Sequence, residues 1–194
     1  MKKITLIAAM LIAAFLFSFK MIETSIWSVD PAHSKLGFSV KHLLISDVDG
    51  SFKNFSSKIT STNEDLTDAV IELSADINSI NTDNEKRDAD LKSAGFFDAQ
   101  KYPKLIFKST SLKKVEGNNY KLTGDLTMHG ITKKIEMDVI VNGPIVHPMS
   151  KKMVTGLKVT GKLKRSDFDI GSSTPGAVVG DEVTINANGE FIKE

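Results

Sequence analysis

The chain has 194 residues, with 25 Lys and Arg against 24 Asp and Glu, and it contains no cysteine. A chain this close to neutral lacks the strong basic field that nucleic acid or an anionic membrane requires of a main partner. The absence of cysteine excludes disulfides, thiolate metal sites, a cysteine nucleophile and a lipid-anchored cysteine.

The first nineteen residues have the layout of an export signal. Lys2 and Lys3 precede an apolar run at residues 4–19 that only two hydroxyl residues interrupt. The run is short for a membrane span, which needs about 20 apolar residues, and it suits a signal peptide. We therefore expect the rest of the chain to work outside the cytoplasm, in the periplasm or secreted.

The end of this signal is not defined. No small-x-small pair, the usual mark of a cleavage site, occurs between Ala13 and Trp27. Two interpretations stay open, a cleaved signal peptide and a retained N-terminal tether. Without residues 1–19, 23 basic residues face 24 acidic ones, so the exported part has a net charge near −1.

Alternation of apolar and polar residues dominates the remaining chain and predicts strands. In residues 120–128, Tyr120, Leu122, Leu126 and Met128 share one face. Gly- and Asn-containing turns separate most of the alternating runs. About eight strands are predicted, in residues 34–44, 50–59, 69–77, 105–112, 120–128, 131–141, 153–163 and 183–191.

Only one segment has the pattern of a helix. Thr82 and Glu85 have the spacing of a capping box, which predicts a helix that runs to about Ser93 and stops at Gly95. This helix is too short and too charged to connect parallel strands, so an antiparallel sheet is expected. Eight antiparallel strands can form a sandwich or an up-and-down barrel, and strands of about ten residues favour the barrel. The predicted fold class is therefore all-β, an eight-stranded antiparallel barrel with one short helix.

Large aromatic residues are numerous for a single small core. Each can be explained by core packing, but as a set they also fit the wall of an apolar cavity, and an eight-stranded barrel has room for one small ligand. The residues concerned are Phe38, Phe52, Phe55, Phe96, Phe97, Phe107 and Phe168.

Several ordered strings resemble the YceI-like family. They are WSVDPAHS at residues 27–34, FSVKH at 38–42, RDADLKS at 87–93, FFDA at 96–99, LTGDLTMHGITK at 122–133 and KRSDF at 164–168. The resemblance covers residues 26–193, which we take as the domain. It implies a lipocalin-like barrel, periplasmic in bacteria, whose apolar pocket holds a polyisoprenoid chain. Asp90 stands where the family helix usually has histidine, so no role of that histidine is transferred.

Two arginines and one histidine are candidate polar contacts of such a pocket. Arg87 or Arg165 could meet an anionic or quinone head group, because a guanidinium suits phosphate or carbonyl oxygens; the alternative is a salt-bridged helix docked on one barrel end. His42 follows the apolar face of its strand, either as a buried wall histidine or as a pocket contact. The predicted ligand-binding set is Phe38, His42, Phe52, Phe55, Phe97, Phe107, Leu126, Arg87 and Arg165.

The four histidines are scattered without ligand spacing, so no metal site is predicted. His33 lies beside Asp30 and Ser34, which has the composition of a hydrolase triad, but no G-x-S-x-G elbow is present. We therefore interpret His33 as part of a hydrogen-bonded turn. No catalytic residue and no cofactor is predicted.

The leading functional hypothesis is an exported carrier for a long apolar molecule, a polyisoprenoid lipid or isoprenoid quinone. Burial alone would hold it, at about 0.8 kcal/mol per CH₂ removed from water. Two alternatives are an enzyme that acts on such a lipid through His33 or His42, and a stress or interaction module with a filled core. A tunnel lined by Phe38, Phe52 and Leu126 would favour the carrier. Transient membrane contact suits this function, and the oligomeric state is not defined by the sequence.

Overall fold

The computed structural model describes residues 23–63 and 65–194. The predicted export signal, residues 1–19, lies outside the described residues. Within the described ranges, no helix is both long and apolar enough to cross a membrane.

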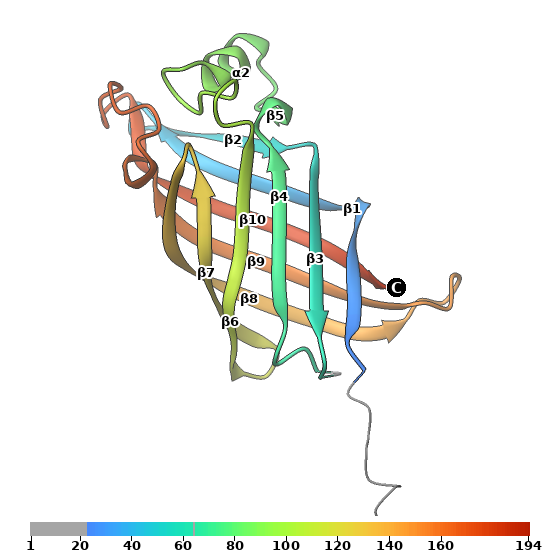
Figure 1. The fold of residues 1–194 in the computed structure, drawn as a ribbon. Coiled ribbons are helices and arrows are strands. Elements are labelled where there is room, and N and C mark those ends of the chain that lie inside the picture. The colour runs from blue at the N-terminus through green and yellow to red at the C-terminus, as the bar shows by residue number, and fades with distance from the viewer. Residues whose placement is uncertain (1–22, 64) are drawn as a thin grey trace, which may run out of the picture.

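Eight antiparallel strands close into a barrel (Figure 1). In spatial order they are β1 (Ser25–His42), β3 (Phe55–Ser61), β4 (Val70–Asp76), β6 (Lys104–Glu116), β7 (Asn119–Met128), β8 (Ile131–Val146), β9 (Met153–Lys164) and β10 (Val179–Lys193). Pairing of β10 with β1 completes the barrel, with Phe38 opposite Ile185. The predicted fold class, an all-β barrel of eight antiparallel strands, is confirmed.

The first strand is longer than the sequence pattern indicated. Its beginning pairs with β3, Trp27 facing Ile59, and its end pairs with β2 (Ser46–Phe52). The register with β10 shifts between Asp30 and Lys35, around Pro31. Proline has no N–H for the ladder and interrupts the alternation, which is why the pattern predicted only residues 34–44. Figure 1 shows β1 bending as it crosses from one part of the barrel to the next.

The predicted strand at residues 50–59 is two strands. A turn at Lys53 and Asn54 separates β2 from β3, and β2 extends the sheet beyond β1. The two-residue strand β5 (Ile80–Asn81) pairs with β2, and the 3-10 helices η1 (Ile77–Ser79) and η2 (Arg165–Phe168) lie at the same end of the barrel as α2.

Helix α2 (Glu85–Lys92) begins later than the capping-box pattern predicted. Its N-cap is Asn84, whose side-chain oxygen accepts a hydrogen bond from the N–H of Arg87 at 3.0 Å. Asp83 has a φ of 58°, which separates Thr82 from the helix start. The Thr82 hydroxyl instead donates to the buried carboxylate of Asp88 at 2.6 Å. The predicted Thr82 cap is therefore wrong, although the helix itself is present.

The two halves of the barrel interior are filled to different degrees. At the end where β1 starts, Trp27, Ile59, Leu66, Tyr120 and Val139 are buried and belong to one packed cluster. Toward α2, inward-facing side chains on several strands stay half-buried. The interior is thus solid at one end and open at the other.

We predict that Gly124→Ala lowers the free energy of unfolding by about 1–3 kcal/mol. A Cβ at this position of β7 would lie 2.4 Å from Cζ of Phe107 and 2.6 Å from the backbone oxygen of Lys108. Gly176→Ala is the control, because a Cβ there meets nothing within 4 Å. Urea unfolding followed by circular dichroism measures both variants. Equal stability of the two would contradict the close approach of Phe107 to β7.

Candidate ligand-binding site

The half of the barrel toward α2 encloses a cavity. The unfilled space amounts to about 1440 Å³, including the part that is open to solvent. All eight barrel strands contribute to the wall, together with Phe52 of β2 and three residues in and after α2, Leu91, Phe96 and Phe97. Because the packed cluster closes the other half, the part of the cavity that is open to solvent lies in the half toward α2, which we call the open end.

The wall of this cavity offers no free hydrogen-bonding group in its depth. Only four of the lining residues are polar: Lys35, Ser57, Arg165 and Asn188. Lys35 and Asn188 are exposed, and the Ser57 hydroxyl donates to the backbone oxygen of Glu72 at 2.8 Å. In the described part of the chain, no buried side-chain nitrogen or oxygen lacks a hydrogen-bond partner. A molecule held here is therefore held by burial of apolar surface.

Seven of the nine predicted site residues line the cavity. The rings of Phe38 and Phe52 are 5.8 Å apart, and the rings of Phe52 and Phe97 meet edge to face at 6.2 Å. This aromatic group connects β1, β2 and the segment after α2. The seven residues are Phe38, Phe52, Phe55, Phe97, Phe107, Leu126 and Arg165.

Arg165 reaches the cavity but cannot serve as a contact for a head group. Its Nε donates to the backbone oxygen of Gly180, and its other four N–H groups point to the oxygens of Ile170, Gly171, Thr174 and Val179. All five donors of a guanidinium are then occupied. Arg165 is buried, and it fixes the loop between η2 and β10. The expected head-group contact at Arg165 is therefore wrong.

Arg87 and His42 lie away from the cavity. Nε and an Nη of Arg87 donate to the hydroxyl and the backbone oxygen of Thr82, both at 2.7 Å, so Arg87 stabilises the entry to α2. His42 is the last residue of β1 and is exposed, so it is neither a buried wall histidine nor a pocket contact. The register of β1 with β10 shifts between Val40 and His42, so the alternation of the sequence does not hold at His42, which is why the pattern misplaced it.

Many residues of the cavity wall were not among the predicted binding residues. The last strand contributes Val179, Val183, Ile185 and Ala187, and the loop after η2 contributes Ile170. The alternation of residues 183–191 was visible, but alternation alone does not say which face points inward. Pairing of β10 with β1 decides it, because Ile185 lies opposite Phe38.

We predict that Arg165→Lys lowers the free energy of unfolding by about 2–5 kcal/mol, because a lysine with three donors leaves at least two loop carbonyls unpaired. Arg87→Lys makes the same chemical change at a half-buried arginine with only two hydrogen bonds, one to a hydroxyl and one to a carbonyl, and should lower the free energy of unfolding by about 1 kcal/mol or less. Urea unfolding compares them. Wild-type stability of Arg165→Lys would contradict the structural role assigned to this arginine.

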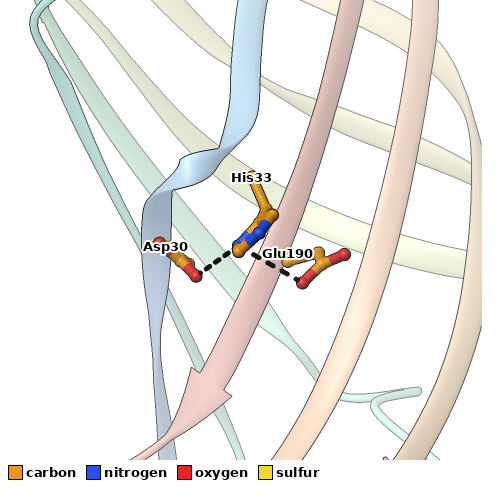
Figure 2. Close-up of side chains that lie close together, drawn as sticks. All are labelled: Asp30, His33 and Glu190. Carbon is orange, nitrogen blue, oxygen red and sulfur yellow. Dashed lines mark hydrogen bonds and ion pairs between the residues drawn. The ribbon is translucent and has the colours of Figure 1, made fainter.

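A second group of polar residues lies where β1 and β10 pair, outside the cavity wall. Figure 2 shows His33 between Asp30 and Glu190. Nδ1 of His33 is 2.8 Å from a carboxylate oxygen of Asp30 and 4.0 Å from one of Glu190. The ligand atoms of these three side chains are close enough to contact one cation. However, His33 and Glu190 are exposed, and His33 and Asp30 are already joined by a hydrogen bond. The sequence showed Asp30 and His33, and only the strand register adds Glu190.

This arrangement changes the pKa values of the pair. The hydrogen bond to Asp30, and then the negative charges of Asp30 and Glu190, raise the pKa of His33 above 6.5. The hydrogen bond with His33 lowers the pKa of Asp30 below 3.8. Any stabilisation by protonated His33 is present below the unfolded pKa near 6.5 and is lost as the pH rises through the raised pKa of the folded state.

We predict that an NMR titration of His33 gives a pKa above 6.5, because the neighbouring carboxylates favour the protonated ring. Asp30→Asn should return the pKa to its ordinary range. Glu190→Gln should lower it less, since Glu190 acts only through its charge at 4.0 Å. An unchanged pKa in Asp30→Asn would show that the bond drawn in Figure 2 does not form in solution.

The fold and the cavity define a lipocalin-like barrel with an apolar interior open at one end. The model of the YceI-like domain matches residues 27–191, and the chain belongs to this family. A UPF0312 protein of Staphylococcus aureus strain N315 is 36% identical over 169 residues, which span 85% of this chain and 96% of the relative.

Two solved structures have a similar fold. The Campylobacter jejuni YceI protein is 33% identical, with a TM-score of 0.72 over 79% of this chain and 90% of its own. A polyisoprenoid-binding domain from Saccharophagus degradans has a TM-score of 0.64 over 87% of this chain and 98% of its own, at 17% identity. The second likeness is one of fold alone.

Proposed function

We propose that this protein is an exported binding protein that holds one long apolar molecule, a polyisoprenoid lipid or isoprenoid quinone, in its barrel cavity. The observation that carries the proposal is the wall of the cavity. It is built from all eight strands, it is lined almost entirely by aliphatic and aromatic side chains, and its buried polar groups are already bonded within the protein. Such a wall selects for an apolar chain and offers little to a polar ligand.

The energetics of burial suit a long chain. Each CH₂ moved from water into the cavity contributes about 0.8 kcal/mol, so affinity grows with the length that the cavity can enclose. Family membership and the fold shared with a polyisoprenoid-binding domain support a barrel that binds apolar ligands. With Arg165 and Arg87 bonded internally, a head group would lie at the open end, near solvent.

The place of action is part of the proposal. The basic and apolar pattern of residues 1–19 supports export, either as a cleaved signal or as a tether. Beyond the cytoplasmic membrane, a lipid can move between membranes only by crossing water. A barrel that encloses an isoprenoid chain would shield the chain during that step.

An enzymatic role has less support. A catalytic group acting on a bound lipid must reach the cavity, and the described wall residues include no nucleophile paired with a base. Asp30, His33 and Glu190 are not among the lining residues. The observations therefore favour binding over catalysis.

We predict that protein purified from its native compartment releases an isoprenoid on organic extraction, detected by mass spectrometry. Ala187→Phe should carry at least about tenfold less, because the added ring projects from the cavity wall and removes room for several CH₂ groups. Asn186→Phe is the matched control, since the neighbouring side chain is exposed and outside the lining.

Three results would count against the carrier. One is a folded protein that yields no lipid and takes up no added isoprenoid. The second is an equal loss of lipid in Asn186→Phe and Ala187→Phe. The third is an Ala187→Phe variant that carries as much lipid as the wild type.

A further inference from the structure

The turn between β1 and β2 carries three consecutive exposed aliphatic side chains. Leu43, Leu44 and Ile45 are 50%, 68% and 84% exposed. The backbone N–H of Leu43 donates to the oxygen of Val178 at 3.0 Å, and Val178 is 40% exposed. We call these four residues the mouth tip. Single exposed aliphatic residues are common on proteins, but a contiguous group usually marks a contact surface.

The backbone of this turn also has a conformation that leucine disfavours. Leu43 has a φ of 50° and Leu44 a φ of 61°, and the N–H of Ile45 bonds back to the oxygen of His42 at 3.2 Å. Two central residues with positive φ are typical of a type I′ turn, which favours Asn-Gly. The turn between β7 and β8 has the same sign of φ at His129 and Gly130, and uses glycine at its second position. The two leucines therefore neither favour this backbone conformation nor pack in the core.

The mouth tip lies beside the open end of the cavity. Val40, three residues before Leu43, and Val179, next to Val178, both line the cavity and are only half-buried. Figure 1 shows β1, β2 and the loop before β10 reaching the same end of the barrel. The exposed aliphatic surface of the tip therefore continues into the apolar wall.

We propose that the mouth tip inserts into the surface of a lipid bilayer and brings the open end of the cavity against it. This inference rests on the proposed function, because a ligand that dissolves in membranes must enter and leave through a membrane. With the tip inserted, the ligand would pass from acyl chains to the cavity wall without exposure to water. The bilayer then covers the four side chains of the mouth tip that the fold leaves in solvent.

The composition of the tip favours a bilayer over a protein partner. Protein contact sites concentrate energy in Trp, Tyr and Arg, and leucine is under-represented among them. A stable protein complex also buries more than about 1,000 Å², which is large for a single turn. A projecting aliphatic turn is shaped to enter the interfacial layer of a membrane.

The charged residues that flank the tip on β1 and β2 form an ion pair. Lys41 pairs with Asp47 across the two strands at 2.9 Å. The tip therefore has no excess of positive charge to seek anionic lipids, and we expect binding to zwitterionic vesicles with little dependence on added anionic lipid.

The test is flotation of the exported protein with phosphatidylcholine vesicles. The double variant Leu43→Asn with Leu44→Gly should lose at least about tenfold in vesicle partitioning, because two inserted aliphatic side chains are removed. Its midpoint of thermal unfolding should equal or exceed that of the wild type, since Asn-Gly suits the turn. Loss of binding would then not be due to unfolding.

The chain provides a matched control at the opposite end of the barrel. Ile145 and Met149, at and after the end of β8, are 59% and 84% exposed. Ile145→Ser with Met149→Ser removes the same number of apolar side chains and should leave vesicle binding unchanged. Uptake of an isoprenoid quinone without vesicles is measured in parallel and should be equal in all three proteins.

These measurements separate the two proposals. Absence of quinone uptake in the wild type would count against the carrier while leaving vesicle binding to test the tip. Wild-type protein that does not float with vesicles would overturn the membrane contact. Vesicle binding by the Leu43→Asn, Leu44→Gly variant equal to that of the wild type would also overturn it. So would an equal loss of binding in the Ile145→Ser, Met149→Ser control, or a dimer that depends on the tip and forms in place of vesicle binding.

Discussion

Closure of the sheet by the β1–β10 pair is the constraint on which the rest of the structure depends. An open sheet would leave two unpaired edges and would fold its apolar face onto itself. Closure pairs the two edge strands and fixes the distance between opposite sides of the barrel. Because of this distance, the inward-facing side chains cannot all contact one another. The half of the barrel around Trp27 and Tyr120 fills by packing, and the half toward α2 stays unfilled. The cavity is a consequence of the backbone hydrogen bonding around it.

The open end is held in place by groups that the ligand need not touch. Arg165 binds five backbone carbonyls, three in the loop that leads into β10 and two at the start of β10, and Arg87 with Asp88 holds Thr82 at the entry to α2. Both arginines act on backbone oxygens around the opening. Hydrogen bonds thus fix the segments at this end of the barrel, while the cavity wall stays apolar. The binding energy then depends on the length of the ligand and not on a particular polar contact.

Much of the fold could be predicted because alternation reports faces directly. The inward residues of β7, including Tyr120 and Leu126, are grouped correctly by the alternation. Six of the seven aromatic residues expected in the wall line the cavity, whereas Phe168 is buried in the packed core and the lining residue Phe191 was not expected. What the sequence could not supply were relations across the barrel. Glu190 joins Asp30 and His33 only through the β1–β10 register, and His42 lies one step beyond the wall. The roles of Arg165 and Thr82 depend on loop geometry, for which the sequence carries no periodic signal.

A crystal structure of the protein purified from its native compartment would show whether the barrel holds an apolar chain. We expect continuous elongated density inside the barrel, in contact with Phe38, Phe52 and Leu126 and reaching the open end near Val179. A cavity that contains only ordered water, or a wall that has closed onto itself, would contradict this expectation.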